Sequence, residues 1–193
     1  SDMSKNGIVI SFGLQKGGVG KTTSVILTAK EISEQCPELK ILAVDFDPQG
    51  NLSKSLGVME DIDEIKGKDI YRCIMGEQSA EDCILKIVDN LDLLPAHEDL
   101  STLTFQMIRK AINEDVGDDV FYMLQDVIDP LRAEYDVILI DLPPERGYLA
   151  KLGLVASDNI IIIMQAEPFP RRAVPRFIKT IEEVIDEYNP ELK

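Results

Sequence analysis

The sequence predicts an α/β protein with a mainly parallel β-sheet that helices cover on both faces. Short apolar runs alternate with segments of helical spacing along the whole chain. The apolar runs are also continuous rather than alternating, which is typical of strands buried on both faces of a sheet. These two patterns favour one layered domain over a helical bundle or a β-sandwich.

Strands are expected wherever apolar residues follow one another without a break and a turn residue or a charge ends the run. Ile8 opens the first of these runs, and a glycine cluster follows it. Pro95 ends the third run. The expected strands are 8–12, 41–44, 91–94, 137–140 and 160–163.

Helices are expected where apolar residues recur at intervals of three or four. The first begins after the glycine cluster and is closed by Pro37. Further helices are expected over 100–112, 120–131 and 173–188, and an exposed loop over 60–68. The last helix is expected to carry Phe177, Ile178, Ile181 and Ile185 on one face, and the core to include Met107, Met123 and Met164.

Length and composition indicate one globular domain spanning residues 1–193, because 45% of residues are hydrophobic and 28% are charged. Residues 1–3 are expected to be a cloning remnant ahead of a start at Met3, with no signal peptide. No apolar run is long enough to span a membrane. Three cysteines without a CxxC pattern predict reduced thiols. We therefore expect a cytoplasmic protein.

Charge is unevenly distributed along the chain. The net charge is −15, and residues 60–136 contain 20 acidic against 7 basic residues, or −13. This acidic middle should repel DNA and anionic membranes at long range. It is either a solubilising face or a docking surface for a basic partner.

A phosphate-binding loop is predicted at 16–23, Lys-Gly-Gly-Val-Gly-Lys-Thr-Thr, between the first strand and the first helix. Small residues let successive backbone N–H groups point at an anion. Lys21 can reach the β- and γ-phosphates, and Thr22 can offer its hydroxyl to Mg²⁺. Gln15 replaces the first glycine of the ordinary pattern, and Lys16 is an additional cation.

Aspartates follow two of the expected strands. Asp45 ends the strand 41–44, Asp47 comes two residues later, and Asp141 ends the strand 137–140. Ligands of open α/β sheets bind at the carboxyl ends of strands, and carboxylate oxygens suit Mg²⁺. On spacing alone, either strand can supply the aspartate on the magnesium side.

Together these segments resemble the ParA/Soj family of deviant-Walker P-loop ATPases, which act in plasmid and chromosome partition. The Asp-Pro-Gln-Gly-Asn run at 47–51 is the most discriminating piece, because related MinD-type enzymes usually differ there. The matching segments are 16–23, 45–52, 93–96 and 135–144.

The resemblance implies a P-loop NTPase fold of the deviant Walker A type, with ATP/ADP and Mg²⁺ as ligands. Lys16 then reaches across a nucleotide-sandwich homodimer to the partner's phosphates, and Asp47 orients the attacking water. Catalysis is assigned to Lys16, Lys21 and Asp47, and the metal side to Thr22, Asp141 and Asp45. The nucleotide is assigned to Lys16, Gly17, Gly18, Val19, Gly20, Lys21, Thr22 and Thr23.

The family also implies weak ATP hydrolysis stimulated by a centromere-binding ParB-type protein, binding to non-specific DNA, and association with the nucleoid. Family members often carry basic residues near the end of this chain, where Glu182, Glu183, Asp186 and Glu187 stand instead. Possible DNA contacts lie just upstream, at Arg171, Arg172, Arg176 and Lys179. The net charge of −15 weighs against DNA binding.

Other departures concern local geometry and length. Phe46, Leu142 and Glu145-Arg146 replace the family's usual residues. The chain stops at Lys193, before the family's last strand and helix elements. The domain is therefore expected to lack those elements.

Three alternatives stay open beside the partition ATPase. The first is a MinD-like positioning factor, although the acidic last helix does not suit an anionic membrane and no membrane partner is expected. The second is an ATP-dependent switch or adaptor for a protein client, without DNA binding. The third, a relative of the nitrogenase iron protein, needs paired cysteines that the spacing does not offer. His97 is read as a bystander in a loop.

Overall fold

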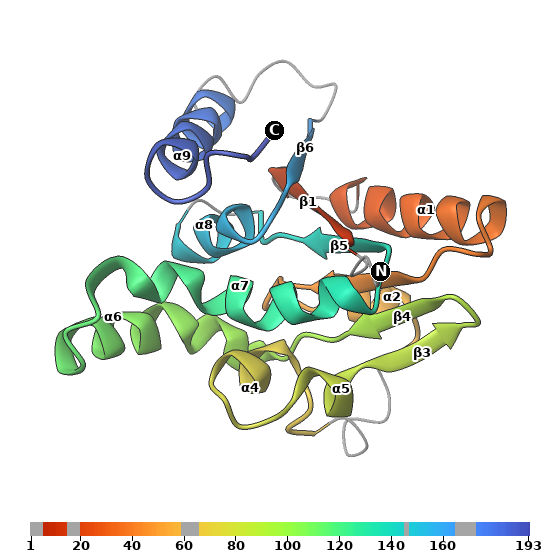
Figure 1. Cartoon of the computed structure of the whole chain (residues 1–193), viewed down its shortest axis with the longest axis horizontal. Helices are drawn as coiled ribbons and strands as arrows, with labels where there is room; N and C mark the ends of the chain where they lie inside the picture. Colours follow the sequence, from red (N-terminus) through yellow and green to blue (C-terminus); the bar gives the residue numbers. More distant parts are fainter. Residues whose placement is uncertain (1–5, 15–19, 59–65, 145–146, 165–172) are drawn as a thin grey trace, which may run out of the picture.

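The computed structural model describes residues 6–14, 20–58, 66–144, 147–164 and 173–193. Within them lies one six-stranded sheet in the order β3-β4-β2-β5-β1-β6 (Figure 1). All pairs are parallel except β3 with β4. The strands are β1 (Ile8–Leu14), β2 (Ile41–Asp45), β3 (Leu85–Val88), β4 (Leu91–Leu94), β5 (Val137–Asp141) and β6 (Asn159–Ile163).

The helices connect these strands. The α-helices are α1 (Gly20–Gln35), α2 (Asn51–Ser55), α4 (Ile70–Ile74), α5 (Ala80–Cys83), α6 (Leu103–Asn113), α7 (Met123–Ile128), α8 (Tyr148–Val155) and α9 (Ala173–Glu187). In the described part of the chain, three 3₁₀ turns accompany them: η1 (Glu98–Thr102), η2 (Gly117–Tyr122) and η3 (Asp129–Ala133).

The sheet separates two hydrophobic clusters, so the prediction of helices on both faces is confirmed. Val25 and Ala29 of α1 pack on one face, against residues such as Phe12 and Leu139. Helices α6, α7, α8 and α9 pack on the other face with the alternate strand residues, including Ile138 and Ile140. Figure 1 shows α1 on one side of the strands and α7 and α8 on the other.

The five expected strands are confirmed, but the structure adds elements that the sequence reading missed. Strand β3 is a short antiparallel edge whose side chains alternate between half-buried and exposed. Helices α2, α4 and α5 are only four or five residues long, too short for a periodic signal. Helix α8 is buried over most of its length and therefore lacks a polar face.

Several local expectations were wrong. Over 120–131 the α-helix covers only Met123–Ile128, with 3₁₀ turns on either side. On α9, Phe177 is buried and Ile181 and Ile185 pack half-buried against the core, but Ile178 is 42% exposed and Val184 is buried instead. Met164 is 65% exposed rather than in the core. Strand β6 is only partly buried, because it lies at the edge of the sheet. Most of the expected loop at 60–68 lies outside the described residues.

Candidate functional site

The expected phosphate loop lies between β1 and α1. Leu14 ends β1 with a φ of 76°, a left-handed conformation that a leucine rarely adopts. Helix α1 then begins at Gly20, and both Lys21 and Thr22 are buried in its first turn, whereas Thr23 is exposed. Lys16, Gly17, Gly18 and Val19 lie outside the described residues. Strand, loop and helix therefore follow in the order that a phosphate loop requires.

Asp141 at the end of β5 holds both side chains of this first turn. Its Oδ1 forms an ion pair with Nζ of Lys21, and its Oδ2 accepts a hydrogen bond of 2.8 Å from the hydroxyl of Thr22. Asp141 has no exposed surface. Burial raises the pKa of its carboxyl, although Lys21 and Thr22 act in the opposite direction. The carboxylate and the hydroxyl thus place two hard oxygen donors side by side.

Asp45 lies next to Asp141, because the register of β2 with β5 pairs these two residues. Its Oδ2 accepts hydrogen bonds from Ser53, from the backbone N–H at 2.9 Å and from the hydroxyl at 2.6 Å. Its Oδ1 accepts a longer bond of 3.2 Å from the N–H of Asp47. Complete burial raises the pKa of Asp45 to about 7. Asp45 therefore anchors the segment that carries Asp47.

Asp47 lies in a tight turn just after β2, at the same carboxyl end of the sheet as Asp45 and Asp141. Its carboxylate accepts a hydrogen bond of 2.9 Å from the N–H of Gln49, and its carbonyl accepts one of 2.8 Å from Gly50. Gly50 has a φ of 66°, which glycine adopts without strain, and α2 starts immediately after it. The Asp-Pro-Gln-Gly-Asn run thus folds back so that Ser53 reaches Asp45.

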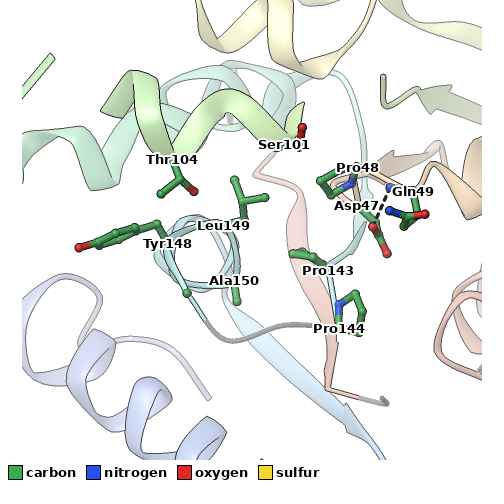
Figure 2. Close-up of a pocket in the computed structure, with 11 residues that line it drawn as sticks. Asp47, Pro48, Gln49, Ser101, Thr104, Pro143, Pro144, Tyr148, Leu149 and Ala150 are labelled. Carbon is green, nitrogen blue, oxygen red and sulfur yellow. Dashed lines mark hydrogen bonds between the residues drawn. The ribbon is translucent and has the colours of Figure 1, made fainter. Parts of the chain in front are cut away.

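A hollow of about 380 Å³ opens beside Asp47. Figure 2 shows Pro143 and Pro144 below Asp47, with Thr104 of α6 facing Leu149 and Tyr148 of α8 across the hollow. Among the described residues, the hollow is lined by Asp47, Pro48, Gln49, Ser101, Thr104, Pro143, Pro144, Gly147, Tyr148, Leu149 and Ala150.

Some residues of this region were missed by the sequence reading. Ser53 binds Asp45 and also accepts a hydrogen bond of 3.1 Å from the N–H of Ala96, so it joins α2 to the loop after β4. A serine two residues past the Asp-Pro-Gln-Gly-Asn run was the available signal. Ser101 and Thr104 reach the hollow from a segment with no motif, and no sequence signal could have found them.

The remaining described candidates, on α9 and before η1, are exposed or half-buried. Arg176 and Lys179 are exposed on the first half of α9, and the acidic residues of its second half are exposed as well. Arg171 and Arg172 lie outside the described residues. His97 accepts a hydrogen bond of 3.1 Å from the N–H of Asp99 and caps η1, which is a structural role.

The cysteines carry no metal-site signal in the part of the chain that the structure describes. Cys73 and Cys83 are buried and Cys36 is half-buried, and all three are free thiols in this structure. Burial raises the pKa of Cys73 and of Cys83, which disfavours the reactive thiolate. Among the described residues, no group of three histidine, cysteine or acidic side chains could hold a metal ion. Within the same ranges, no helix is long and apolar enough to cross a bilayer.

Strand β1, the loop after it and the lysine-bearing helix α1 follow one another along the chain, and aspartates end the adjacent strands β2 and β5. This arrangement defines the class as a P-loop nucleoside triphosphatase. The family model AAA_31, an AAA domain, matches residues 7–193. The chain therefore belongs to this family of ParA- and MinD-like P-loop ATPases.

Individual relatives agree with this assignment. The chromosome partitioning protein ParA of Myxococcus xanthus is 34% identical over 97% of this chain and 62% of its own length. Cobyrinic acid a,c-diamide synthase from Mycobacterium smegmatis, with bound ADP and magnesium, has a TM-score of 0.85 at 32% identity, over 97% of this chain and 71% of its own. A plasmid partition protein from Borrelia burgdorferi has a TM-score of 0.76 at 25% identity, over 92% and 74%. The chain spans less than two thirds of the length of the Myxococcus relative.

Proposed function

We propose that this chain binds Mg-ATP at the carboxyl end of β5, beside Asp141, and hydrolyses it slowly as a ParA-type ATPase. The observation that carries this proposal is the joint contact of Asp141 with Lys21 and Thr22 beside Asp47. Relatives add support, since the synthase noted above is described with ADP and magnesium. ATP, ADP and Mg²⁺ are accordingly the proposed ligands.

The donor chemistry fits Mg²⁺, because a threonine hydroxyl and a carboxylate are hard oxygen ligands. The hydroxyl of Thr22 would bind the ion directly, and the carboxylate of Asp141 would act on it from the outer coordination shell. The bound ion would neutralise charge on the phosphates. Lys21 would exchange its ion pair with Asp141 for contacts to the phosphates, together with the loop amides of residues 17–23. Both carboxylate oxygens of Asp45 already accept hydrogen bonds from backbone and serine donors. We therefore assign Asp45 a smaller role in binding Mg²⁺ than Thr22 and Asp141.

Hydrolysis needs a water molecule placed in line with the terminal phosphate. Asp47 lies 4% exposed on the wall of the hollow, with its carboxylate fixed by the N–H of Gln49. A carboxylate held in this way can orient that water. Lys16 is proposed to act from the other subunit of an ATP-bound homodimer, as an arginine finger does. Turnover then depends on dimerisation.

We further propose that the dimer acts in DNA partition, with a centromere-binding ParB-type protein that stimulates turnover. Arg176 and Lys179 are exposed and available for phosphate contacts, with Arg171 and Arg172 proposed beside them. The partition names of two relatives support this reading. The proposed location is the cytoplasm, in association with the nucleoid.

The experiment measures phosphate release and the anisotropy of a labelled random-sequence duplex, without nucleotide, with ADP and with ATP. We expect slow release that Asp47→Ala abolishes and exposed Asp119→Ala leaves unchanged. DNA binding should require ATP, weaken with salt, and fall in Arg176→Ala. Lys16→Ala should lower turnover far more than nucleotide affinity. Phosphate release that is equal in Asp47→Ala and wild type would refute the assigned chemistry.

A second candidate is an ATP-dependent switch for a protein client that does not bind DNA. The net charge of −13 over residues 60–136 and the exposed acids on the second half of α9 favour it. Normal ATP hydrolysis without DNA binding in any nucleotide state would support this candidate over partition.

A further inference from the structure

Helix α6 carries apolar residues on the face that packs in the core and also on its exposed face. Leu103 and Met107 are buried against the neighbouring helices. Phe105, Ile108 and Ile112 are 62%, 45% and 74% exposed. We call these three residues the α6 stripe.

The stripe is a continuous surface. Its members are spaced three and four residues apart, so they lie together on one side of the helix. Single exposed apolar residues are ordinary, but three large ones on one helix face indicate an interaction site. By contrast, Leu27 on α1 is also 61% exposed, but no other large exposed apolar residue accompanies it on the described part of that helix.

One member of the stripe lines a hollow that shares Tyr148 with the candidate catalytic hollow. Ile108 lines a second hollow, of about 240 Å³, together with Tyr148 of α8. Tyr148 also lines the hollow that contains Asp47. Tyr148 is 45% exposed and lies opposite Thr104 of α6 (Figure 2). A segment seated on the stripe would therefore border the second hollow, whose residue Tyr148 also lines the hollow beside Asp47.

Charge indicates what the stripe accepts. The segment that follows α6, which we call the acidic turn, exposes Glu114 and Asp115 and, at the start of η2, Asp118 and Asp119. The bases on the helix are Arg109 and Lys110, and Lys110 is paired with Glu114 at 4.0 Å. The excess of acid favours a cationic occupant. A second copy of the chain carries the same net charge of −15 and is therefore a less favourable occupant of this surface than a cationic partner.

We propose that the α6 stripe docks a cationic amphipathic helix of a partner protein, with its apolar side on Phe105, Ile108 and Ile112 and its basic side toward the acidic turn. The docking itself does not depend on the proposed function. Only the effect of docking on ATP hydrolysis rests on that proposed function. A docked segment beside Tyr148 is placed to influence Asp47, and so to couple partner binding to turnover.

The test uses a fluorescein-labelled peptide of leucine and lysine, about 18 residues or five helical turns long, with leucines on one face. Its anisotropy is titrated with the 193-residue chain without nucleotide. We expect binding that weakens about tenfold or more in the double variant Phe105→Ser/Ile112→Ser. Leu27→Ser is the matched control and should bind as wild type does. Circular dichroism verifies that each variant is folded.

Two further arms separate shape from charge. A scrambled peptide of the same composition should bind much more weakly, since it presents no apolar face. The double variant Asp115→Asn/Asp119→Asn should weaken binding and reduce its dependence on salt. Asparagine tolerates the φ of 51° at position 115.

Three results would overturn the proposal. These are absence of peptide binding, equal binding by the scrambled peptide, and unchanged affinity in the stripe variant. Self-association of the wild type that the stripe variant abolishes would assign the surface to a second copy instead. Nucleotide binding is measured separately with a fluorescent ATP analogue. A wild-type chain that binds no nucleotide would refute the proposed function and leave the docking proposal standing. A wild-type chain that binds nucleotide but no peptide would refute docking and leave the proposed function standing.

Discussion

Strands β5 and β6 flank β1 on its two sides, and each carries at least four consecutive apolar residues, but they differ in what covers them. Ile138, Leu139 and Ile140 of β5 have no exposed surface, whereas Ile161 of β6 is 40% exposed. Strand β5 pairs with both β1 and β2. Among the described residues, β1 is the one strand that pairs with β6, and on the other side of β6 the N–H of Ile160 donates to the carbonyl of Lys193 at 2.9 Å. Neighbours, rather than apolar content, therefore decide burial.

The same difference decides where chemistry can be placed. Strand β5 ends in Asp141, which is fully buried and held by two side chains of α1. The burial of its strand fixes this carboxylate within the sheet. Strand β6 leads to Met164, which is largely exposed. A buried central strand can therefore position a charged group more rigidly than an edge strand can.

The largest expected contrast is between two isoleucines. Ile140→Ala should lower the free energy of unfolding by about 2–5 kcal/mol, because it opens a cavity in the core. Ile161→Ala, at 40% exposure, should cost less than about 1.5 kcal/mol. Urea denaturation measures both. Equal losses would mean that β6 is as well packed as β5.

The second contrast concerns pH, because the folded protein raises the pKa of Asp45 from 3.8 to about 7. The folded state therefore binds the proton more tightly, and this contribution to stability is complete below pH 3.8 and lost as pH rises through about 7. Nucleotide-free protein should lose about 2–3 kcal/mol from this group between pH 5 and pH 7. Asp45→Asn should show a flatter profile in chemical denaturation. Parallel wild-type and variant profiles would contradict the buried environment of Asp45.

A third, smaller effect is expected where α8 meets the end of β5. A Cβ at Gly153 would lie 2.0 Å from Cδ2 of Leu142, which is itself fully buried. Gly153→Ala should therefore destabilise the fold by about 1–3 kcal/mol through overpacking. Leu142→Ala in the same chain should recover part of that loss, because it removes the clashing atoms. Strictly additive losses in thermal denaturation would exclude the clash.

The smallest effect is expected at the exposed end of β6. Met164→Ser should change the free energy of unfolding by no more than about 0.5 kcal/mol, since Met164 is 65% exposed. Thermal denaturation beside Gly153→Ala provides the comparison. A loss as large as that of Gly153→Ala would show that Met164 is packed in the folded protein.

Much of this fold could be predicted because its buried strands carry continuous apolar runs. Strand β3 escaped prediction, since it is short and its side chains alternate at a sheet edge. The expected face of α9 failed at Ile178 because periodicity identifies an apolar face but not which residues find neighbours. The α6 stripe shows the same limit, since nothing in the sequence distinguishes buried Met107 from exposed Ile108.

The candidate site was predictable where chemistry fixes residue order, as at Lys21, Thr22 and Asp141. Contacts between distant segments were not predictable, because they depend on how the chain folds back. Ser53 reaches Asp45 only through the turn at Gly50. The structure shows that Lys21 and Thr22 contact Asp141. The roles assigned to all the site residues, these three included, stay predictions.

The most direct test of the central claim titrates a fluorescent ATP analogue into the 193-residue chain, with Mg²⁺ and with EDTA. Wild type should bind more tightly with Mg²⁺. Lys21→Ala should lose about 100-fold or more in affinity, because the phosphates lose their cation. Thr22→Val and Asp141→Asn should lose the magnesium-dependent part. Equal affinity in wild type and Asp141→Asn, with or without Mg²⁺, would contradict a Mg-nucleotide site at this edge of the sheet.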